Sequence, residues 1–150
     1  MKIFQKTIMI AAVAGLCFSI TACTRRYKPM LSSHDGINFK TISLAQAEEI
    51  SKAENKPLFV FAHASWCPTC KKMEQEVLVQ KKLGDVYNQQ FIDVAIDIDS
   101  PEGHKLNDRY KIRATPTLFF LNADGSIAKK AEGFMTAEEL LTTADGLKIK

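Results

Sequence analysis

Two cysteines separated by two residues, Cys67 and Cys70, are the side chains of this 150-residue sequence best suited to covalent chemistry. A thiolate attacks disulfides and binds metals, and two thiols at this spacing can also form an internal disulfide. Four interpretations follow from the spacing alone: a redox pair, half of a metal site, a haem attachment site, or a structural disulfide.

Two of these interpretations lack the other residues that they need. Covalent haem attachment uses a CxxCH motif, and Lys71 occupies the position of its histidine. A tetrahedral zinc site needs four ligands, but there is no second CxxC, and His34, His63 and His104 are scattered along the chain. A structural disulfide stays open, although closing so small a loop removes little entropy from the unfolded chain. We therefore favour the redox pair and expect no metal and no cofactor.

The N-terminus predicts export from the cytoplasm. Lys2 and Lys6 precede an apolar run at residues 8–18, which is too short to cross a bilayer because a spanning helix needs about 20 apolar residues. Basic residues followed by such a run are typical of a secretory signal peptide. Residues 20–23 (ITAC) resemble a bacterial lipobox, so we predict a lipoprotein signal peptide at residues 1–22.

The lipobox makes Cys23 the predicted lipidation site. Two or more acyl chains give stable membrane anchoring, so we expect the protein on the periplasmic face of a bacterial membrane. The alternative is ordinary cleavage near Ala22, which leaves Cys23 as a free thiol. Cys17 leaves with the signal peptide. In the lipidated form Cys67 and Cys70 are then the free cysteines, in a compartment where disulfides persist.

The mature chain carries almost no net charge. The full sequence has 20 basic and 17 acidic residues, and removal of residues 1–22 takes away two lysines and no acidic residue. No basic patch of the kind that nucleic-acid binding needs is present, so we expect no nucleic-acid partner. Residues 23–36 contain Pro, Ser and Gly without periodicity, and we predict that they form a lipid-anchored tether to a domain at residues 37–150.

The pattern of apolar residues in this domain predicts alternating strands and helices. Residues 58–62 are uniformly apolar, as in a strand covered on both faces, whereas residues 91–98 alternate between apolar and polar. Ser43 and Thr136 begin capping boxes, which mark helix starts. The predicted class is α/β, a central mixed β-sheet with helices on both faces. In chain order we expect a strand near Phe39, a helix from 44 to before 55, a strand at 58–62, a helix from 67 to about 83, a strand at 91–98, a helix from 101, a strand at 117–121, a strand ending near 132, and a helix from 137.

Four short stretches accompany this order of elements: residues 56–57 (KP), 64–71 (ASWCPTCK), 114–120 (ATPTLFF) and 133–138 (GFMTAE). They resemble the thioredoxin superfamily, and in particular the C-terminal periplasmic domain of transmembrane thiol:disulfide interchange reductases. The matching stretches span most of the predicted domain. The resemblance implies a thioredoxin fold and thiol–disulfide oxidoreductase activity.

Cys67 is predicted to be the attacking thiol and Cys70 the resolving thiol. A helix N-terminus carries about half a positive charge and unpaired N–H groups, so Cys67 at that end is stabilised as the reactive thiolate. Cys70 lies one turn later on the inner side, where it can resolve a mixed disulfide by attacking Cys67. Pro68 fits the first helical turn, because an N–H at that position has no partner within the helix and its absence in proline costs nothing. This chemistry also requires that foreign disulfides reach the sulfur of Cys67.

The resemblance adds three predicted substrate-binding residues, Trp66, Thr115 and Pro116. In the family, the proline is cis and packs beside the CxxC. The backbone of the preceding residue pairs with the substrate polypeptide, a form of strand addition. Trp66 is expected to be partly exposed and to flank the docking surface. The alternatives are simple packing for Trp66 and a trans proline at the start of a strand for Pro116.

One departure from the family pattern concerns the acceptor of the Cys70 proton. The family places a buried aspartate six residues before the first cysteine, and here Phe61 stands at that position. Glu74 is the predicted substitute, because it shares a helix face with Cys70 and the interchange domains have a glutamate there; otherwise it is a solvated helix residue. His63 stands where relatives often carry an aromatic residue, and it either modulates the thiol near neutral pH or has a structural role alone.

The predicted function is that of a membrane-anchored, exported thiol–disulfide oxidoreductase. It would reduce disulfides of client proteins through Cys67 and Cys70, and a membrane thiol reductase would recharge it. Two alternatives stay open: a disulfide oxidase or isomerase with the same chemistry, and a non-catalytic binding lipoprotein with a static disulfide. The sequence does not determine the redox direction, the client, the electron donor, or which membrane holds the anchor.

Overall fold

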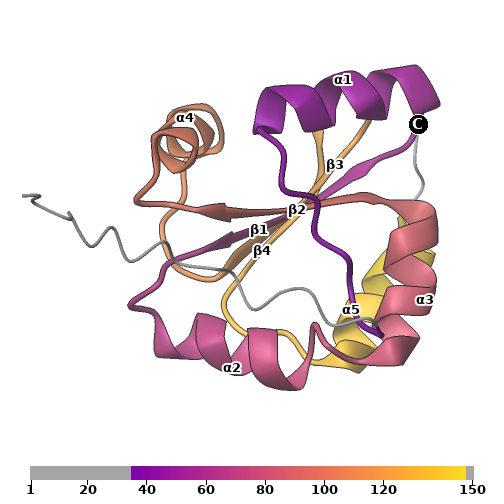
Figure 1. The fold of residues 1–150 in the computed structure, drawn as a ribbon, viewed down its shortest axis with the longest axis vertical. Coiled ribbons are helices and arrows are strands. Elements are labelled where there is room, and N and C mark those ends of the chain that lie inside the picture. Colours follow the sequence, from indigo (N-terminus) through magenta and orange to yellow (C-terminus); the bar gives the residue numbers. More distant parts are fainter. Residues whose placement is uncertain (1–34, 148–150) are drawn as a thin grey trace, which may run out of the picture.

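A computed structural model describes residues 35–147 of the chain. The predicted signal peptide, the predicted lipidation site Cys23 and nearly all of the predicted tether lie outside these residues and stay predictions. Figure 1 shows the described part as one sheet with helices on both of its faces. The elements are α1 (Leu44–Glu54), β1 (Leu58–His63), α2 (Pro68–Glu76), α3 (Lys81–Gln90), β2 (Ile92–Asp97), α4 (Pro101–Tyr110), β3 (Thr117–Leu121), β4 (Ile127–Glu132) and α5 (Ala137–Gly146).

The four strands lie in the order β2-β1-β3-β4. β1 runs parallel to β2, with Val60 opposite Val94, and antiparallel to β3, with Val60 opposite Phe119. β4 pairs antiparallel with β3. The predicted mixed sheet is therefore confirmed. Every residue of β1 is buried, as expected for an inner strand with both faces covered, and its last residue, His63, leads directly into the CxxC segment.

Alternate side chains of the inner strands face two separate cores. Phe59, Phe61 and Phe120 pack with residues of α2, α3 and α5, whereas Val60 and Phe119 pack with residues of α1 and α4. This division follows from the two-residue repeat of a strand, which sends successive side chains to opposite faces. The helices α1 and α4 thus cover one face and α2, α3 and α5 the other, and the predicted placement of helices on both faces is confirmed.

The predicted single helix from 67 to about 83 is wrong, because two helices occupy this region. α2 ends at Glu76 and α3 begins at Lys81, with a turn between them. The carbonyl of Leu78 accepts a hydrogen bond from the N–H of Ile37 at 2.9 Å, so it is not available to a continuing helix. Gly36 lies against the same turn so closely that a Cβ on it would overlap the backbone of Val79. The break is thus set by a tertiary contact with a distant segment, which helical periodicity does not report.

The predicted strand near Phe39 is also absent. This segment is extended and runs beside β2, where the N–H of Lys40 donates to the carbonyl of Asp93 at 2.8 Å. One such bond does not make a ladder, since β-pairing needs a repeating series of bonds. Phe39 is partly buried against the core that contains Phe59 and Phe61, so the segment covers an edge of the sheet.

Both predicted capping boxes are present. The hydroxyl of Ser43 accepts from the N–H of Gln46, and the side chain of Gln46 accepts in return from the N–H of Ser43. Thr136 and Glu139 make the same exchange at the start of α5. Each box satisfies N–H groups that the first turn of a helix leaves without partners. Among the described residues, no helix is long and apolar enough to cross a bilayer.

Candidate active site

Cys67 and Cys70 form a disulfide at the N-terminus of α2. Cys67 is the N-cap residue, with extended backbone angles, and Pro68 takes the first helical position. The Sγ atom of Cys67 accepts a hydrogen bond from the N–H of Cys70 at 3.1 Å. A helix N-terminus presents unpaired N–H groups and positive charge. The sequence prediction that Cys67 lies at this end, with Cys70 one turn later on the buried side, is confirmed.

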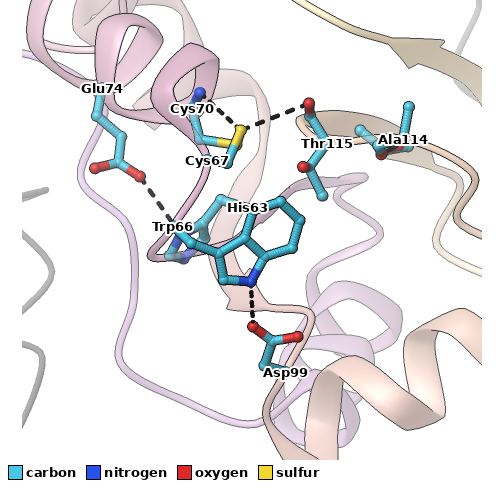
Figure 2. Close-up of a disulfide and its surroundings, with 9 residues drawn as sticks. His63, Trp66, Cys67, Cys70, Glu74, Asp99, Ala114 and Thr115 are labelled. Carbon is cyan, nitrogen blue, oxygen red and sulfur yellow. Dashed lines mark hydrogen bonds and ion pairs between the residues drawn. A yellow bond between two sulfur atoms is a disulfide. The ribbon is translucent and has the colours of Figure 1, made fainter.

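The loop before β3 lies against the disulfide. The Sγ of Cys67 is 3.6 Å from the carbonyl oxygen of Thr115, and Figure 2 shows this carbonyl pointing at the sulfur. The Thr115–Pro116 peptide bond is cis, as the family resemblance implies. Two hydrogen bonds hold the loop in place: the hydroxyl of Thr117 donates to the carbonyl of Ala114 at 2.6 Å, and the N–H of Gly133 donates to the carbonyl of Pro116 at 2.8 Å.

The two cysteines differ from their neighbours in exposure. Cys67 is 3% exposed and Cys70 is fully buried. The sequence analysis expects a Cys67 sulfur that foreign disulfides can reach, and in this oxidised state the structure corrects that picture, because the residue is almost covered. The residues on either side of it, Trp66 and Pro68, are both exposed. Cys67 therefore lies just beneath the surface, and little of its area is accessible to a partner thiol.

Trp66 is 62% exposed beside the disulfide, which confirms the prediction of an exposed ring at this position. Its Nε1–H donates to Oδ2 of Asp99 at 2.7 Å. Asp99 lies in the turn between β2 and α4, far from Trp66 in the sequence (Figure 2). The sequence analysis missed Asp99, because only the parallel pairing of β1 with β2 brings the ends of the two strands together.

Phe134 is a second exposed aromatic residue that the sequence analysis did not assign. It is 38% exposed and lies just after β4. The ammonium group of Lys72 on α2 stands 5.3 Å from the centre of its ring, a distance at which a cation is attracted to the π-face. The pair links the segment after β4 to the helix that carries the cysteines.

Glu74 and His63 form a buried pair at the inner side of α2. The side chains are 6% and 3% exposed, and Oε1 of Glu74 lies 3.5 Å from Nδ1 of His63. Burial lowers the pKa of His63, and the charge of Asp97 opposes this effect. Phe61, at the position of the family's aspartate, stacks on the His63 ring with the two centres 5.4 Å apart. Glu74 is therefore not a solvated helix residue, and the sequence analysis did not predict its contact with His63.

Comparison with known proteins is consistent with this arrangement. The sequence model of a family described as a thioredoxin-like domain matches residues 44–147. Thioredoxin-1 of Drosophila melanogaster is 34% identical over 84 residues, which are 56% of this chain and 74% of that protein. The thiol:disulfide interchange protein DsbD of Neisseria meningitidis is 26% identical over 113 residues, which are 73% of this chain but 19% of that protein.

The fold has a similar counterpart among solved structures. A putative disulphide-isomerase from Bacteroides thetaiotaomicron aligns with a TM-score of 0.65 at 32% sequence identity. The alignment covers 74% of this chain and 92% of that one.

Proposed function

The chain belongs to the thioredoxin-like family of thiol–disulfide oxidoreductases, and from this premise we propose that it is a membrane-anchored, exported reductant of protein disulfides. The observation that carries the proposal is the disulfide between Cys67 and Cys70 at the N-terminus of α2. The backbone carbonyl of Thr115 lies beside the sulfur of Cys67. A reactive pair, a helix end that stabilises a thiolate and a backbone segment for docking thus occur together.

The proposed reaction is a two-electron exchange. The thiolate of reduced Cys67 attacks a client disulfide, so that a bond forms between Cys67 and one client sulfur. The other client sulfur leaves with the electron pair and takes up a proton. Cys70 then attacks Cys67, which releases the second client sulfur as a thiol and leaves the Cys67–Cys70 disulfide. The client gains two electrons and the chain loses two, so a membrane thiol reductase must recharge the pair.

The proposed docking surface surrounds this disulfide. Trp66 offers an exposed ring, and Thr115 and Pro116 offer the backbone segment to which an extended client peptide could add as a strand. Phe134 lies just after β4 with its ring near Lys72 of α2, and adds apolar surface. We also propose that Cys67 and Cys70 are the catalytic residues, as the attacking and the resolving thiol.

Anchoring and location rest on the sequence of the first 23 residues. The basic and apolar segments and the ITAC motif support export and lipidation at Cys23. Mass spectrometry of the protein purified from a membrane fraction tests this part, because lipidation adds acyl chains to an N-terminal Cys23. An unmodified N-terminus at another residue would contradict it.

Insulin reduction in the presence of dithiothreitol tests the enzymatic part. The wild-type chain should accelerate precipitation of the insulin B chain, and Cys67→Ser should not, because it lacks the attacking sulfur. Cys70→Ala should instead accumulate a covalent complex with its client, since nothing resolves the mixed disulfide. A wild-type rate equal to background would favour the non-catalytic binding protein.

The midpoint potential of the Cys67–Cys70 pair distinguishes the reductant from the alternatives. The relative from Bacteroides thetaiotaomicron is described as a putative disulphide-isomerase, so an isomerase is the second candidate. Equilibration with glutathione buffers should give a potential of about −270 mV for a thioredoxin-like reductant. A potential of about −180 mV is typical of an isomerase, and one of about −120 mV is typical of an oxidase. Either value would overturn the proposed direction of electron transfer.

A further inference from the structure

His63 and Glu74 bring two ionisable groups together in the interior next to the redox pair. Figure 2 shows the Glu74 carboxylate extending from α2 toward His63, which ends β1. Oε1 of Glu74 lies 3.5 Å from Nδ1 of His63, and both side chains are almost completely covered. Burial of two such groups together is costly unless each serves the other as a partner.

The pair can take up a proton. Burial lowers the pKa of His63, so its imidazole is neutral at neutral pH. The ionisable groups that act on His63 are Glu74 of α2, which lies against it, and Asp97 of β2. A carboxylate at Glu74 beside a neutral imidazole leaves a net negative charge in the interior, and one added proton cancels that charge.

The carboxylate of Glu74, which can take up a proton, shares a helix face with Cys70. Glu74 follows Cys70 by four residues on α2, and side chains at this spacing share a helix face. Both are buried, so both point into the same core. His63, which lies against the carboxylate of Glu74, is stacked on Phe61 with the two rings 6° from parallel.

We propose that His63 is a positioning residue for the resolving step of the reaction, in which it orients Glu74 as the acceptor of the Cys70 proton. The inference rests on the proposed function. In this step the Cys70 proton passes to Glu74, and the Cys70 sulfur bonds to that of Cys67. The bond from Cys67 to the client breaks, and its electron pair leaves with the client sulfur, which takes a proton from water. Nδ1 of His63 faces Oε1 of Glu74, and the other carboxylate oxygen receives the proton.

Two substitutions at position 63 separate this role from simple packing. His63→Phe keeps an aromatic ring on Phe61 but removes the nitrogen that faces Glu74. His63→Asn loses the ring but places an amide N–H near the position of Nδ1. His104→Phe is the matched control, because His104 is an exposed histidine on α4.

The test follows the full-length reduced chain after mixing with a peptide that contains one disulfide. Acid quenching and mass spectrometry give the rates of mixed-disulfide formation and resolution between pH 6 and pH 9. At pH 7, His63→Phe should slow resolution by at least about tenfold, a part of the roughly 10²–10⁴-fold that a general base typically contributes. The deficit should shrink toward pH 9, because a rising pH itself favours the thiolate over the thiol and makes a protein base less important. Formation of the mixed disulfide should be unchanged, His63→Asn should recover much of the rate, and His104→Phe should behave as wild type.

Several outcomes would overturn the proposal. An unchanged resolution rate in His63→Phe would do so, and so would a loss of equal size at every pH, which indicates a structural role. If His63→Phe does not fold, Glu74→Gln, which keeps the shape of Glu74 but cannot accept the proton, should show the same pH-dependent loss. A wild-type rate in that variant also refutes the proposal. A wild-type chain that forms no mixed disulfide at all would refute the proposed function, whereas normal formation with unaltered resolution refutes only the role of His63.

Discussion

The sulfur of Cys67 and the carbonyl oxygen of Thr115 lie 3.6 Å apart, although 48 residues separate them in the sequence. The contact exists because β1 and β3 are antiparallel neighbours, so that the end of β1 meets the start of β3. The loop that carries Thr115 is fixed in turn by the bond from Gly133 to Pro116. The backbone of Thr115, and not its side chain, is therefore what the sulfur meets.

Thr115→Val should leave insulin reduction close to the wild-type rate. Valine keeps the shape of threonine and removes the hydroxyl, while the carbonyl that faces Cys67 belongs to the backbone and is unchanged. Cys67→Ser, which should be inactive, gives the background rate of insulin reduction against which the rate of Thr115→Val is compared. A large loss of activity in Thr115→Val would show that the hydroxyl takes part.

Asp99→Ala should free the ring of Trp66. The Nε1–H of Trp66 donates to Asp99 at 2.7 Å, and the alanine side chain offers no acceptor. Trp66 is the only tryptophan in the chain, so steady-state fluorescence anisotropy reports on this ring alone and should fall. Stability should change by only about 1 kcal/mol, the usual net value of one hydrogen bond.

Asp108→Ala is the control for that experiment, because it removes an exposed aspartate from α4. Its tryptophan anisotropy should match the wild type. An Asp99→Ala protein with unchanged anisotropy would mean that other contacts hold the ring.

Asp93→Asn should stabilise the protein at pH 8 and have less effect near pH 4. Asp93 is buried on β2, and its Oδ1 has no hydrogen-bond partner among the described residues. Burial raises the pKa of its carboxyl well above the usual 3.8, and Lys56 and Lys40 oppose the shift. The folded state therefore holds a proton that the unfolded state releases. The stability that this proton contributes is complete below pH 3.8 and is lost as the pH rises through the folded-state pKa.

Urea denaturation of wild type and Asp93→Asn at several pH values measures this effect. The difference in unfolding free energy should grow with pH to about 1–3 kcal/mol, the range for an unsatisfied buried polar group. A difference that stays constant across the pH range would show that ionisation of Asp93 is not its source.

Gly103→Ala should destabilise the protein by about 1–3 kcal/mol, as overpacking usually does. Gly103 lies in the first turn of α4, and a Cβ on it would overlap the backbone of Asp97 and Ile98. The N–H of Gly103 also donates the capping hydrogen bond to the hydroxyl oxygen of Ser100 at 3.0 Å, so the helix start cannot easily move away.

Gly146→Ala provides the contrast, because no atom lies within 4 Å of a Cβ at that position near the end of α5. It should be neutral or stabilising, since alanine is the better helix former by about 1 kcal/mol. Thermal unfolding of both variants checks the pair. Equal melting temperatures would contradict the close approach of α4 to β2.

Much of the active segment could be predicted from local sequence. Cys67, Cys70 and Pro68 follow a buried strand and begin a helix, and each of these features depends on residues close by in the chain. The same holds for the capping boxes at Ser43 and Thr136. Local patterns succeed here because hydrogen bonds within one turn and the alternation of a strand are short-range effects.

Tertiary structure decided the rest. The break between α2 and α3 depends on the hydrogen bond from the N–H of Ile37 to the carbonyl of Leu78. Trp66 bonds to Asp99, and Glu74 contacts His63; in both cases the partner comes from a different part of the fold. The exposure of Cys67, only 3%, likewise depends on what packs around it. The sequence by itself determined the chemistry of the pair and the class of fold, because residue type and periodicity carry both. Which groups surround the sulfurs was settled by the order of the strands, since that order brings distant residues within bonding distance.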